Sequence, residues 1–307
     1  MSDQEGGLTR RDFLRGVSIA AATVAATGLP AAVSRAADVA PAAAAASAAE
    51  KRARVVLIRD AAAVNADGTV NADVVAHMLD EAVAKLLGVN TAQAAWAQLL
   101  KPTDTVGIKS NVWTPIRTPE VVEQALRQRV IAAGVPEASV TVTDREARKL
   151  LTECTALINI RPARAHFWAG MGGCVKNYIM FSDNPSQYHP NACEDLAKVW
   201  DLFQVKKATR LNILLLLTPQ FVCRGPHSID ARYVWPYKGL LMSTDPVAVD
   251  ALGAHLLHLK RMAVFGEEQP GTPTSHIGFA DLKYGLGVSD LARIDLIKLG
   301  WPDDILL

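Results

Sequence analysis

Several features that identify large classes of protein are missing from this sequence. Its 32 Lys and Arg residues are balanced by 31 Asp and Glu residues, which leaves a net charge of +1. Nucleic-acid-binding proteins carry a basic surface and recognisable motifs, and neither is found, so we expect no nucleic-acid partner. After the N-terminal region, no apolar run is long enough to cross a bilayer, so we expect no membrane span in the mature chain.

Cysteine is scarce and widely spaced, and the common hydrolase motifs are absent. The closely spaced cysteines that hold iron–sulfur clusters do not occur, so we expect no iron–sulfur cluster in this chain. Neither G-x-S-x-G nor H-E-x-x-H is found, which disfavours nucleophilic hydrolases and zinc proteases. Buried thiols and disulfide pairs both remain open for the four cysteines, which are Cys154, Cys174, Cys193 and Cys223.

The N-terminus has the pattern of an export signal. Arg10 and Arg11 are followed by Phe13, Leu14 and Arg15, then by a short, weakly apolar run over residues 17–29 and a small-residue region at 32–37. This arrangement is typical of a twin-arginine signal, which a receptor reads as an address. We therefore expect residues 1–36 to be a signal peptide that engages the twin-arginine translocase. The mature protein would then be periplasmic or otherwise exported.

The rest of the chain divides into a linker and a folded domain. Residues 37–52 are dominated by alanine and predict a flexible linker. Residues 53–307 have the length of one large domain or of two tightly joined lobes. Without residues 1–36 the chain has 28 charges of each sign, so the mature protein is nearly neutral.

Strand-like and helix-like patterns alternate along residues 53–307. This alternation predicts an α/β fold with a mixed or mostly parallel sheet flanked by helices. We expect strands at 54–59, 105–109, 139–143, 156–160, 211–217, 238–242 and 294–299. We expect helices at 70–87, 119–133, 193–205, 246–259 (capped by Thr244 or Asp245) and 279–284. Residues 161–192 show little periodicity, and long irregular segments in compact domains are usually functional.

Polar residues follow the apolar strands, where ligands of open α/β sheets bind. Each of them could instead be a helix cap or a solvated loop residue, but together they predict a cleft. The strand-end set is Lys109, Asn111, Asp144, Arg145, Arg161, Arg164, His166, Gln220, Cys223, Ser243, Thr244 and Asp245.

A glycine-rich stretch lies inside the irregular segment. Gly172 and Gly173 would let backbone N–H groups approach an anion, and Lys176 would supply charge beside Asn177. A tight packing turn is an equally good interpretation of the same residues. No cofactor is named by the sequence, and a metal site would have to be assembled in space from His166, Cys174 and His189.

Five blocks of the sequence resemble the domain of unknown function 362 family. They are Val106–Asn111, Leu157–Pro162 with His166 after it, Gly173–Asn177, Arg224–Pro226 and Ser243–Asp250. The resemblance covers nearly all of the mature chain and implies an α/β domain, which some members join to ferredoxin-type iron–sulfur modules. It implies no named reaction.

The resemblance also implies a set of polar site positions. They are Lys109, Asn111, Asp144, His166, Lys176, Asn177, His189, Asp245 and Asp250. Two residues depart from the family pattern: Arg164 stands where relatives often carry lysine, and Leu215 where they often carry aspartate. Arginine keeps the charge without the nucleophilicity, and the missing carboxylate weakens the case for a complete metal or acid–base site.

We therefore expect an exported protein that binds a small anionic ligand or cofactor at the strand ends. Lys109, His166 and Asp144 are the candidate catalytic residues, with His166 as acid or base. The candidate ligand-binding residues are Asn111, Gly172, Gly173, Lys176, Asn177 and Asp245. Two alternatives stay open: a non-catalytic accessory or cofactor-delivery protein for an exported redox partner, and a metal-dependent redox enzyme.

Overall fold

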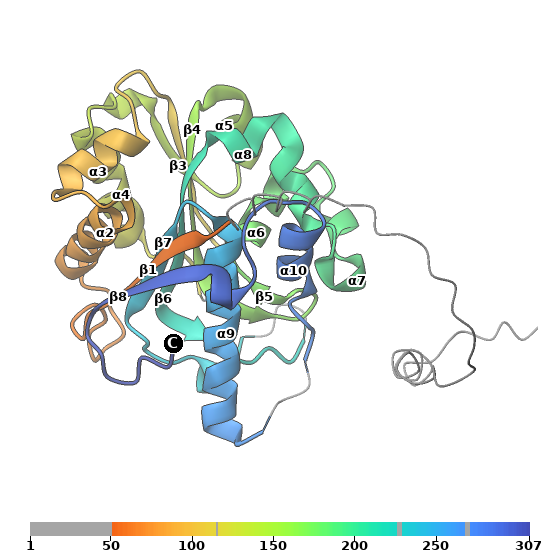
Figure 1. Cartoon of the computed structure of the whole chain (residues 1–307). Coiled ribbons are helices and arrows are strands. Elements are labelled where there is room, and N and C mark those ends of the chain that lie inside the picture. Colours follow the sequence, from red (N-terminus) through yellow and green to blue (C-terminus); the bar gives the residue numbers. More distant parts are fainter. Residues whose placement is uncertain (1–50, 115, 226–228, 268–270) are drawn as a thin grey trace, which may run out of the picture. The chain divides into compact units, whose positions relative to one another are not determined.

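A computed structural model describes residues 51–307 except residues 115, 226–228 and 268–270. The signal predicted at 1–36 lies outside the described residues, as does most of the linker predicted at 37–52. The described part is one α/β unit built on an eight-stranded sheet (Figure 1). The fold class predicted from the sequence is therefore confirmed.

The sheet is mixed but mostly parallel. Its strands are β1 (Ala53–Arg59), β2 (Val106–Lys109), β3 (Val140–Thr143), β4 (Ala156–His166), β5 (Gly170–Gly172), β6 (Thr209–Gln220), β7 (Gly239–Ser243) and β8 (Ile294–Gly300). The order across the sheet is β3-β2-β4-β6-β7-β1-β8, and β7 is antiparallel to both of its neighbours. The short β5 pairs antiparallel with the end of β4. The carboxyl ends of β2, β4 and β6 consequently meet at one edge of the sheet.

Helices cover both faces of the sheet (Figure 1). The helices α2 (Ala72–Leu87), α3 (Ala92–Leu99) and α4 (Glu120–Ala132) pack on one face. The other face carries α5 (Ala147–Glu153), α6 (Cys174–Asn177), α9 (Pro246–Phe265) and α10 (Ser275–Leu282). The short α7 (Pro190–Cys193) and α8 (Val205–Ala208) complete the described helices. None of the helices that the structure describes is both long and apolar enough to cross a membrane.

The central strands are apolar throughout because both of their faces are buried. In β6, Leu211, Ile213 and Leu215 face the core beneath α2–α4, whereas Leu214 and Leu216 face the core beneath α9. Successive side chains of a strand point to opposite faces, so a strand covered on both sides has apolar residues at every position. This explains the continuous leucine run that the sequence shows.

The end of α2 and the start of α9 follow the predicted signals, whereas α9 runs six residues past the predicted 259 and α10 begins four residues before the predicted 279. Asn71 caps α2 by accepting a hydrogen bond from the backbone N–H of Val74, and Gly88 ends the helix with a φ of 68°. Of the two caps proposed for α9, Asp245 is the one used: its side chain accepts hydrogen bonds from the backbone N–H groups of Val247 and Ala248.

Two predictions for the middle of the chain are wrong. The segment 161–192 is not irregular from its start, because β4 continues to His166 and turns back through β5 into α6. The helix predicted at 193–205 is mainly a 3-10 helix, Leu196–Gln204, followed by α8. The extension of β4 was missed because polar side chains and a proline interrupt its apolar pattern, and its pairing with β6 shifts register between Pro162 and Arg164. The helices α3 and α5 were also missed.

Candidate functional site

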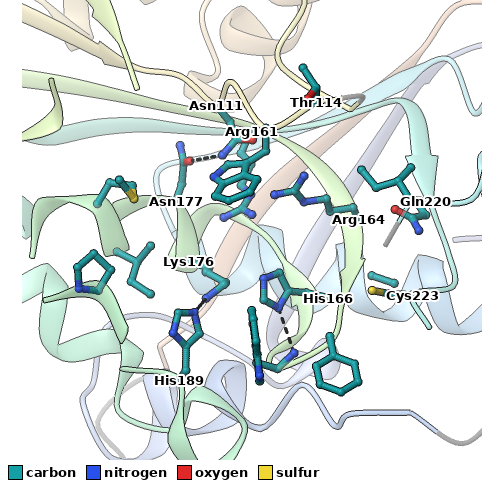
Figure 2. Close-up of a pocket in the computed structure, with 18 residues that line it drawn as sticks. Asn111, Thr114, Arg161, Arg164, His166, Lys176, Asn177, His189, Gln220 and Cys223 are labelled. Atoms are coloured by element: carbon teal, nitrogen blue, oxygen red, sulfur yellow. Dashed lines mark hydrogen bonds between the residues drawn. The ribbon is translucent and has the colours of Figure 1, made fainter. Parts of the chain in front are cut away.

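A pocket of about 300 Å³ lies at the carboxyl ends of β2, β4 and β6 (Figure 2). Residues after β2, along the end of β4, in α6 and after β6 form its walls. This is the edge where open α/β sheets bind ligands. Its described lining residues are Asn111, Trp113, Thr114, Arg161, Arg164, Ala165, His166, Phe167, Trp168, Lys176, Asn177, Ile179, Met180, Pro185, His189, Gln220, Cys223 and Ile229.

Three buried cations face this pocket. The exposed fractions of Arg161, Arg164 and Lys176 are 3%, 8% and 3%. No carboxylate is among the described lining residues, and none of the three cations forms an ion pair with a described Asp or Glu. Burial is the main cause that lowers the pKa of Arg164 to about 9, and the charge of Arg161 adds to it. The carboxylates of Asp144 and Asp250 act on Arg161 without pairing directly with it, so the pocket concentrates positive charge that no carboxylate of its described lining pairs with.

Lys109 and Asp144 form a buried ion pair behind the pocket wall. The Lys109 ammonium donates to the Asp144 carboxylate and, at 2.9 Å, to the backbone carbonyl of Ser110. Burial lowers the pKa of Lys109 to about 8, against the opposing effect of Asp144. The second oxygen of Asp144 accepts from the backbone N–H of Val112 at 3.2 Å. Both side chains are thus occupied within the protein, and neither is among the lining residues.

Asn177 ties β2, β4 and α6 together at the pocket. Its Nδ2 lies 3.1 Å from the carbonyl oxygen of Lys109 and 2.9 Å from Oδ1 of Asn159. Its Oδ1 accepts from Nδ2 of Asn111 at 3.3 Å. The Asn111 Oδ1 atom, in turn, is buried without a hydrogen-bond partner in the described structure. Because this oxygen at the pocket wall accepts no hydrogen bond from a described residue, it can accept one from a ligand.

The glycine-rich turn holds a carboxylate of the protein itself. The Asp250 side chain, on α9, accepts hydrogen bonds from the backbone N–H groups of Cys174 at 2.6 Å and Val175 at 2.8 Å. A Cβ atom on Gly173 would lie 2.5 Å from Cγ of Asp250, and one on Gly172 would lie 2.6 Å from the Arg161 guanidinium. Gly172 and Gly173 thus make room for Arg161 and Asp250 and are not among the residues that line the pocket, so their approach to a ligand stays a prediction.

His166 is neutral and presents a hydrogen-bond donor. Its Nδ1 accepts from the backbone N–H groups of Trp168 at 3.2 Å and Ala169 at 3.3 Å. Burial, followed by the charges of Lys176 and Arg161, lowers the pKa of His166 to about 2. In the neutral ring the proton then resides on Nε2. This arrangement suits a donor to a bound ligand better than the acid or base expected from the sequence.

Lys176 lies between His189 and Cys193. Its Nζ is 3.1 Å from Nε2 of His189 (Figure 2) and 4.0 Å from Sγ of Cys193. Burial, with smaller contributions from the charges of Arg161 and Arg164, lowers the pKa of Lys176 to about 8, against the effect of Cys193. The prediction that Lys176 faces an opening agrees with its place in the pocket lining.

The chain takes a strained path to bring His189 and Cys193 to Lys176. Asn191, Ala192 and Cys193 are three consecutive residues with φ of 51°, 55° and 63°. Residues other than glycine rarely adopt this left-handed conformation, which costs on the order of 1 kcal/mol or more at each position. Strain of this kind clusters at functional sites, where it fixes side chains in a required position.

Aromatic side chains form the mouth of the pocket. Trp113 and Phe167 are 36% and 42% exposed, respectively, and Trp168 stands beside His166 and His189 with ring centroids 5.8 and 5.0 Å away. The guanidinium of Arg164 lies 5.9 Å from the Trp113 ring centroid. Flat apolar walls around buried cations favour a ligand that combines an anionic group with a planar or apolar part.

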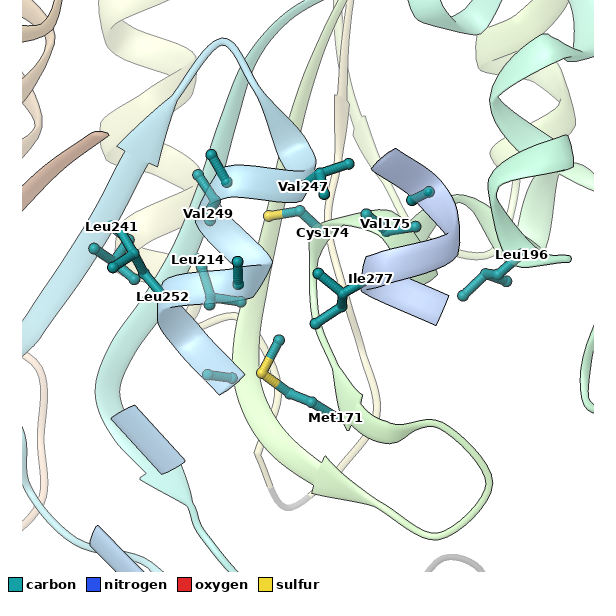
Figure 3. Packing of buried hydrophobic residues seen from close by; sticks show 14 of the residues in the cluster. Met171, Cys174, Val175, Leu196, Leu214, Leu241, Val247, Val249, Leu252 and Ile277 are labelled. Carbon is teal, nitrogen blue, oxygen red and sulfur yellow. The ribbon is translucent and has the colours of Figure 1, made fainter. Parts of the chain in front are cut away.

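Besides Lys109, Asp144, Gly172 and Gly173, the predicted site residues Asp245 and Cys174 also lie outside the pocket lining. Asp245 is the cap of α9, and its second oxygen accepts from the backbone N–H of Val288 at 3.0 Å. Cys174 is buried in the core beneath α9, against Val247 and Met171 (Figure 3). The predicted strand-end position of Asp245 is correct, but its side chain serves the helix rather than the pocket.

The residues proposed as metal ligands do not form a metal site. His166 and His189 approach each other as stacked rings with centroids 6.5 Å apart, but Cys174 lies in the core. Within the described residues, no group of three or more His, Cys, Asp or Glu side chains could hold a metal ion. All four cysteines are free thiols, of which Cys174 and Cys193 are buried.

The sequence understated the part played by arginine. Arg161 and Arg164 belong to the strand-end set, but neither was among the expected ligand-binding residues. They point to the pocket because β4 runs past the edge of the parallel sheet into the turn to β5. Arginines placed directly after a buried apolar strand were the available signal, whereas nothing local to Trp113 or Trp168 indicated a pocket wall.

Comparison with known proteins yields one match. Residues 128–255 match the model of a family described as Domain of unknown function (DUF362). No curated protein and no solved structure matches the chain. The matched segment contains Arg161, His166, Lys176 and Asp250, while Lys109 and Asn111 precede it. The matched segment, which is less than half of the chain, is therefore similar to the domain-of-unknown-function family that the sequence blocks resemble.

Proposed function

We propose that this protein binds a small organic anion in the pocket at the ends of β2, β4 and β6. One observation carries the proposal: three buried cations, Arg161, Arg164 and Lys176, face a cavity whose described lining contains no carboxylate. Buried charges are costly unless they are paired. A bound anion would supply the missing partner, so binding and charge compensation would occur together.

Several residues of the pocket have a defined role in this proposal. The Nε of Arg161 is buried without a hydrogen-bond partner in the described structure. Guanidinium groups bind carboxylate or phosphate through two parallel hydrogen bonds, so Arg161 and Arg164 would hold the anionic group. Nε2 of neutral His166 would donate to the same ligand. Trp113 and Trp168 would cover its apolar part.

The proposal is tested with a charged probe and its neutral analogue. Isothermal titration would compare 3-phenylpropanoate with 3-phenylpropanamide, which has nearly the same shape without the charge. We expect the acid to bind, and the amide to bind at least about tenfold more weakly, because a charge-assisted contact contributes more than 1.4 kcal/mol. Equal affinity for the two would contradict the proposal.

A matched pair of arginine variants locates the site. Arg164→Gln removes one cation from the pocket, and Arg232→Gln removes an exposed arginine that pairs with Asp230 outside it. The first should weaken the binding of 3-phenylpropanoate by about tenfold or more, and the second should leave it unchanged. If both variants bind as the wild type does, the anion is held elsewhere.

Two further hypotheses about activity can be tested with the same purified protein. An accessory protein for an exported redox partner would bind its ligand without turning it over, so recovery of unchanged ligand after long incubation would favour it. A metal-dependent redox enzyme gains no support from the described side chains, which form no group suited to a metal. Stoichiometric metal in natively expressed protein would reopen that hypothesis.

We propose in addition that the chain is exported through the twin-arginine pathway. The proposal rests on Arg10 and Arg11, the short apolar run after them and the alanine-rich stretch that follows. Replacing both arginines by lysine should keep the precursor in the cytoplasm while the folded domain remains unchanged. An unchanged periplasmic yield would contradict this proposal.

A further inference from the structure

Lys176 differs from the other pocket cations because an amine can form a covalent bond with a carbonyl carbon. Its side chain is 3% exposed and lines the pocket, and it forms no ion pair with a carboxylate of the described residues. A lysine that is desolvated and close to other cations loses its proton more easily and becomes a nucleophile. Arg161 and Arg164 are cations of this kind, and both act on Lys176.

The surroundings of Lys176 favour the free amine. Nε2 of His189 lies 3.1 Å from Nζ, and burial followed by the charge of Lys176 lowers the pKa of His189, so this neighbour adds no negative charge beside the amine. His189 is only half-buried, so a proton that leaves the ammonium group has a path to solvent beside it. The charged and titratable groups that act on Lys176 or are acted on by it are Arg161, Arg164, His166, His189, Cys193 and His276. None of them is a carboxylate that would hold the ammonium form.

Lys109 provides an internal comparison. Burial lowers its pKa to about 8, as it does for Lys176. However, its ammonium group donates to Asp144 and to the carbonyl of Ser110, and it is fully buried away from the pocket. A carbonyl compound in the pocket would therefore meet Lys176 and would not meet Lys109.

We propose that Lys176 forms a Schiff base with a small oxo acid whose carboxylate is held by Arg161 and Arg164. The inference rests on the proposed anion site and names the ligand class: a carboxylate that carries a ketone or aldehyde, with an apolar group between the aromatic walls. The free amine of Lys176 attacks the carbonyl carbon, and the carbonyl oxygen takes up a proton to give a carbinolamine. Loss of water then leaves the carbon–nitrogen double bond. The reaction consumes one amine and one carbonyl and releases one water, so no oxidant or reductant is required.

The strained turn at Asn191–Cys193 supports this inference independently. It brings His189 and Cys193 within 3.1 and 4.0 Å of the Lys176 Nζ atom, although three residues must adopt positive φ to do so. A lysine that served only as a fixed positive charge would be stabilised better by a carboxylate than by a histidine nitrogen and a thiol. The turn therefore places the amine beside groups without a fixed negative charge, although Cys193 acts in the direction of the ammonium form.

The test is reductive trapping with phenylpyruvate. Sodium borohydride delivers hydride to an imine carbon and converts the Schiff base into a stable secondary amine, which peptide mapping by mass spectrometry locates. A pKa about two units below that of a surface lysine leaves roughly a hundredfold more amine at pH 7. We therefore expect Lys176 to be labelled at least about tenfold faster than any other lysine, with a rate that levels off above pH 8. Labelling of surface lysines should continue to rise towards pH 10.

Matched variants separate the amine from its charge. Lys176→Arg keeps a cation in the pocket but cannot form an imine, so it should lose the adduct with phenylpyruvate, and its melting temperature should show that the protein remains folded. Lys149→Arg replaces an exposed lysine and should leave the labelling of Lys176 unchanged. His189→Gln should slow the trapping at pH 7 and have less effect at pH 9, where most of the amine is already free.

The outcomes distinguish the two proposals. Binding of 3-phenylpropanoate without any adduct on Lys176 would overturn the Schiff-base inference and leave the anion site in place. Failure of both acids to bind would overturn both proposals. Labelling of Lys109 or of surface lysines at the same rate as Lys176 would also overturn the inference, because the wild-type protein itself provides that comparison.

Discussion

Gly173 offers the sharpest test of how the pocket is built. The sequence predicted that this glycine lets a ligand approach the backbone, whereas the structure places the Asp250 carboxylate there. A Cβ atom at position 173 would lie 2.5 Å from Cγ and 2.6 Å from Oδ2 of Asp250. The φ of −131° at Gly173 is open to any residue, so alanine would introduce a clash without backbone strain.

The cost of Gly173→Ala follows from what has to move. Asp250 is fully buried, belongs to α9 and accepts hydrogen bonds from the backbone N–H groups of Cys174 and Val175. Overpacking a rigid interior costs about 1–3 kcal/mol, and each hydrogen bond to a charged group contributes about 1.5–3 kcal/mol. We expect a loss of about 3 kcal/mol in the free energy of unfolding. For a domain of this size, that corresponds to about 6–12 °C in melting temperature.

Urea denaturation and thermal unfolding measure this loss directly. The matched control is Gly278→Ala in α10, where an added Cβ would have nothing within 4 Å and helix propensity should rise slightly. If Asp250 causes the clash, the cost of Gly173→Ala should largely disappear in an Asp250→Ala background. A Gly173→Ala protein as stable as the wild type would show that Asp250 does not restrict the side chain at this position. Weaker 3-phenylpropanoate binding at unchanged stability would instead show that Gly173 contacts the ligand.

Two other carboxylates give predictions of their own. Asp245→Ala should lower the free energy of unfolding by about 1–2 kcal/mol because α9 loses its cap, and Asp245→Asn should lower it less. Neither variant should change the binding of 3-phenylpropanoate. Weaker binding would show that Asp245 belongs to the site. Burial raises the pKa of Asp250 to about 7, so its contribution to stability is present below about pH 4 and is lost as the pH rises towards 7. Unfolding free energies from urea titrations at pH 4 to 8 should therefore fall more steeply with pH in the wild type than in Asp250→Asn, and parallel curves would contradict this.

The framework of the fold was predictable because its signals are local. Leu211, Ile213 and their neighbours are apolar at every position, which indicates a strand buried on both faces. Gly88 and Asp245 mark the ends of helices by their backbone and hydrogen-bonding properties. The end of β4 escaped prediction because Arg161 and Arg164 face a pocket instead of a core, and a strand that lines a polar cavity loses its apolar pattern.

The site was predictable in position but only partly in detail. The strand-end positions predicted for Asn111, Arg164 and His166 fall in one pocket, because the carboxyl ends of parallel strands meet at one edge of the sheet. The side-chain roles depend on partners far away in sequence: Asp250 reaches the N–H groups of Cys174 and Val175 from 75 or more residues away. No pattern within one segment carries that information.

The buried charged residues around the pocket fall into two groups: those that are bound within the protein framework and those that face the cavity. Asp144 compensates Lys109, and Asp250 is committed to the turn at Gly173, so each buried carboxylate is used to hold the framework. Arg161, Arg164 and Lys176 are left facing the cavity without a described carboxylate of their own. Burying three such cations lowers the stability of the protein, and a bound anion would reduce that loss. Burial first, and the charges of neighbouring cations second, lower the pKa values of Lys176 and His166, so the features that would bind the anion also prepare the amine beside it.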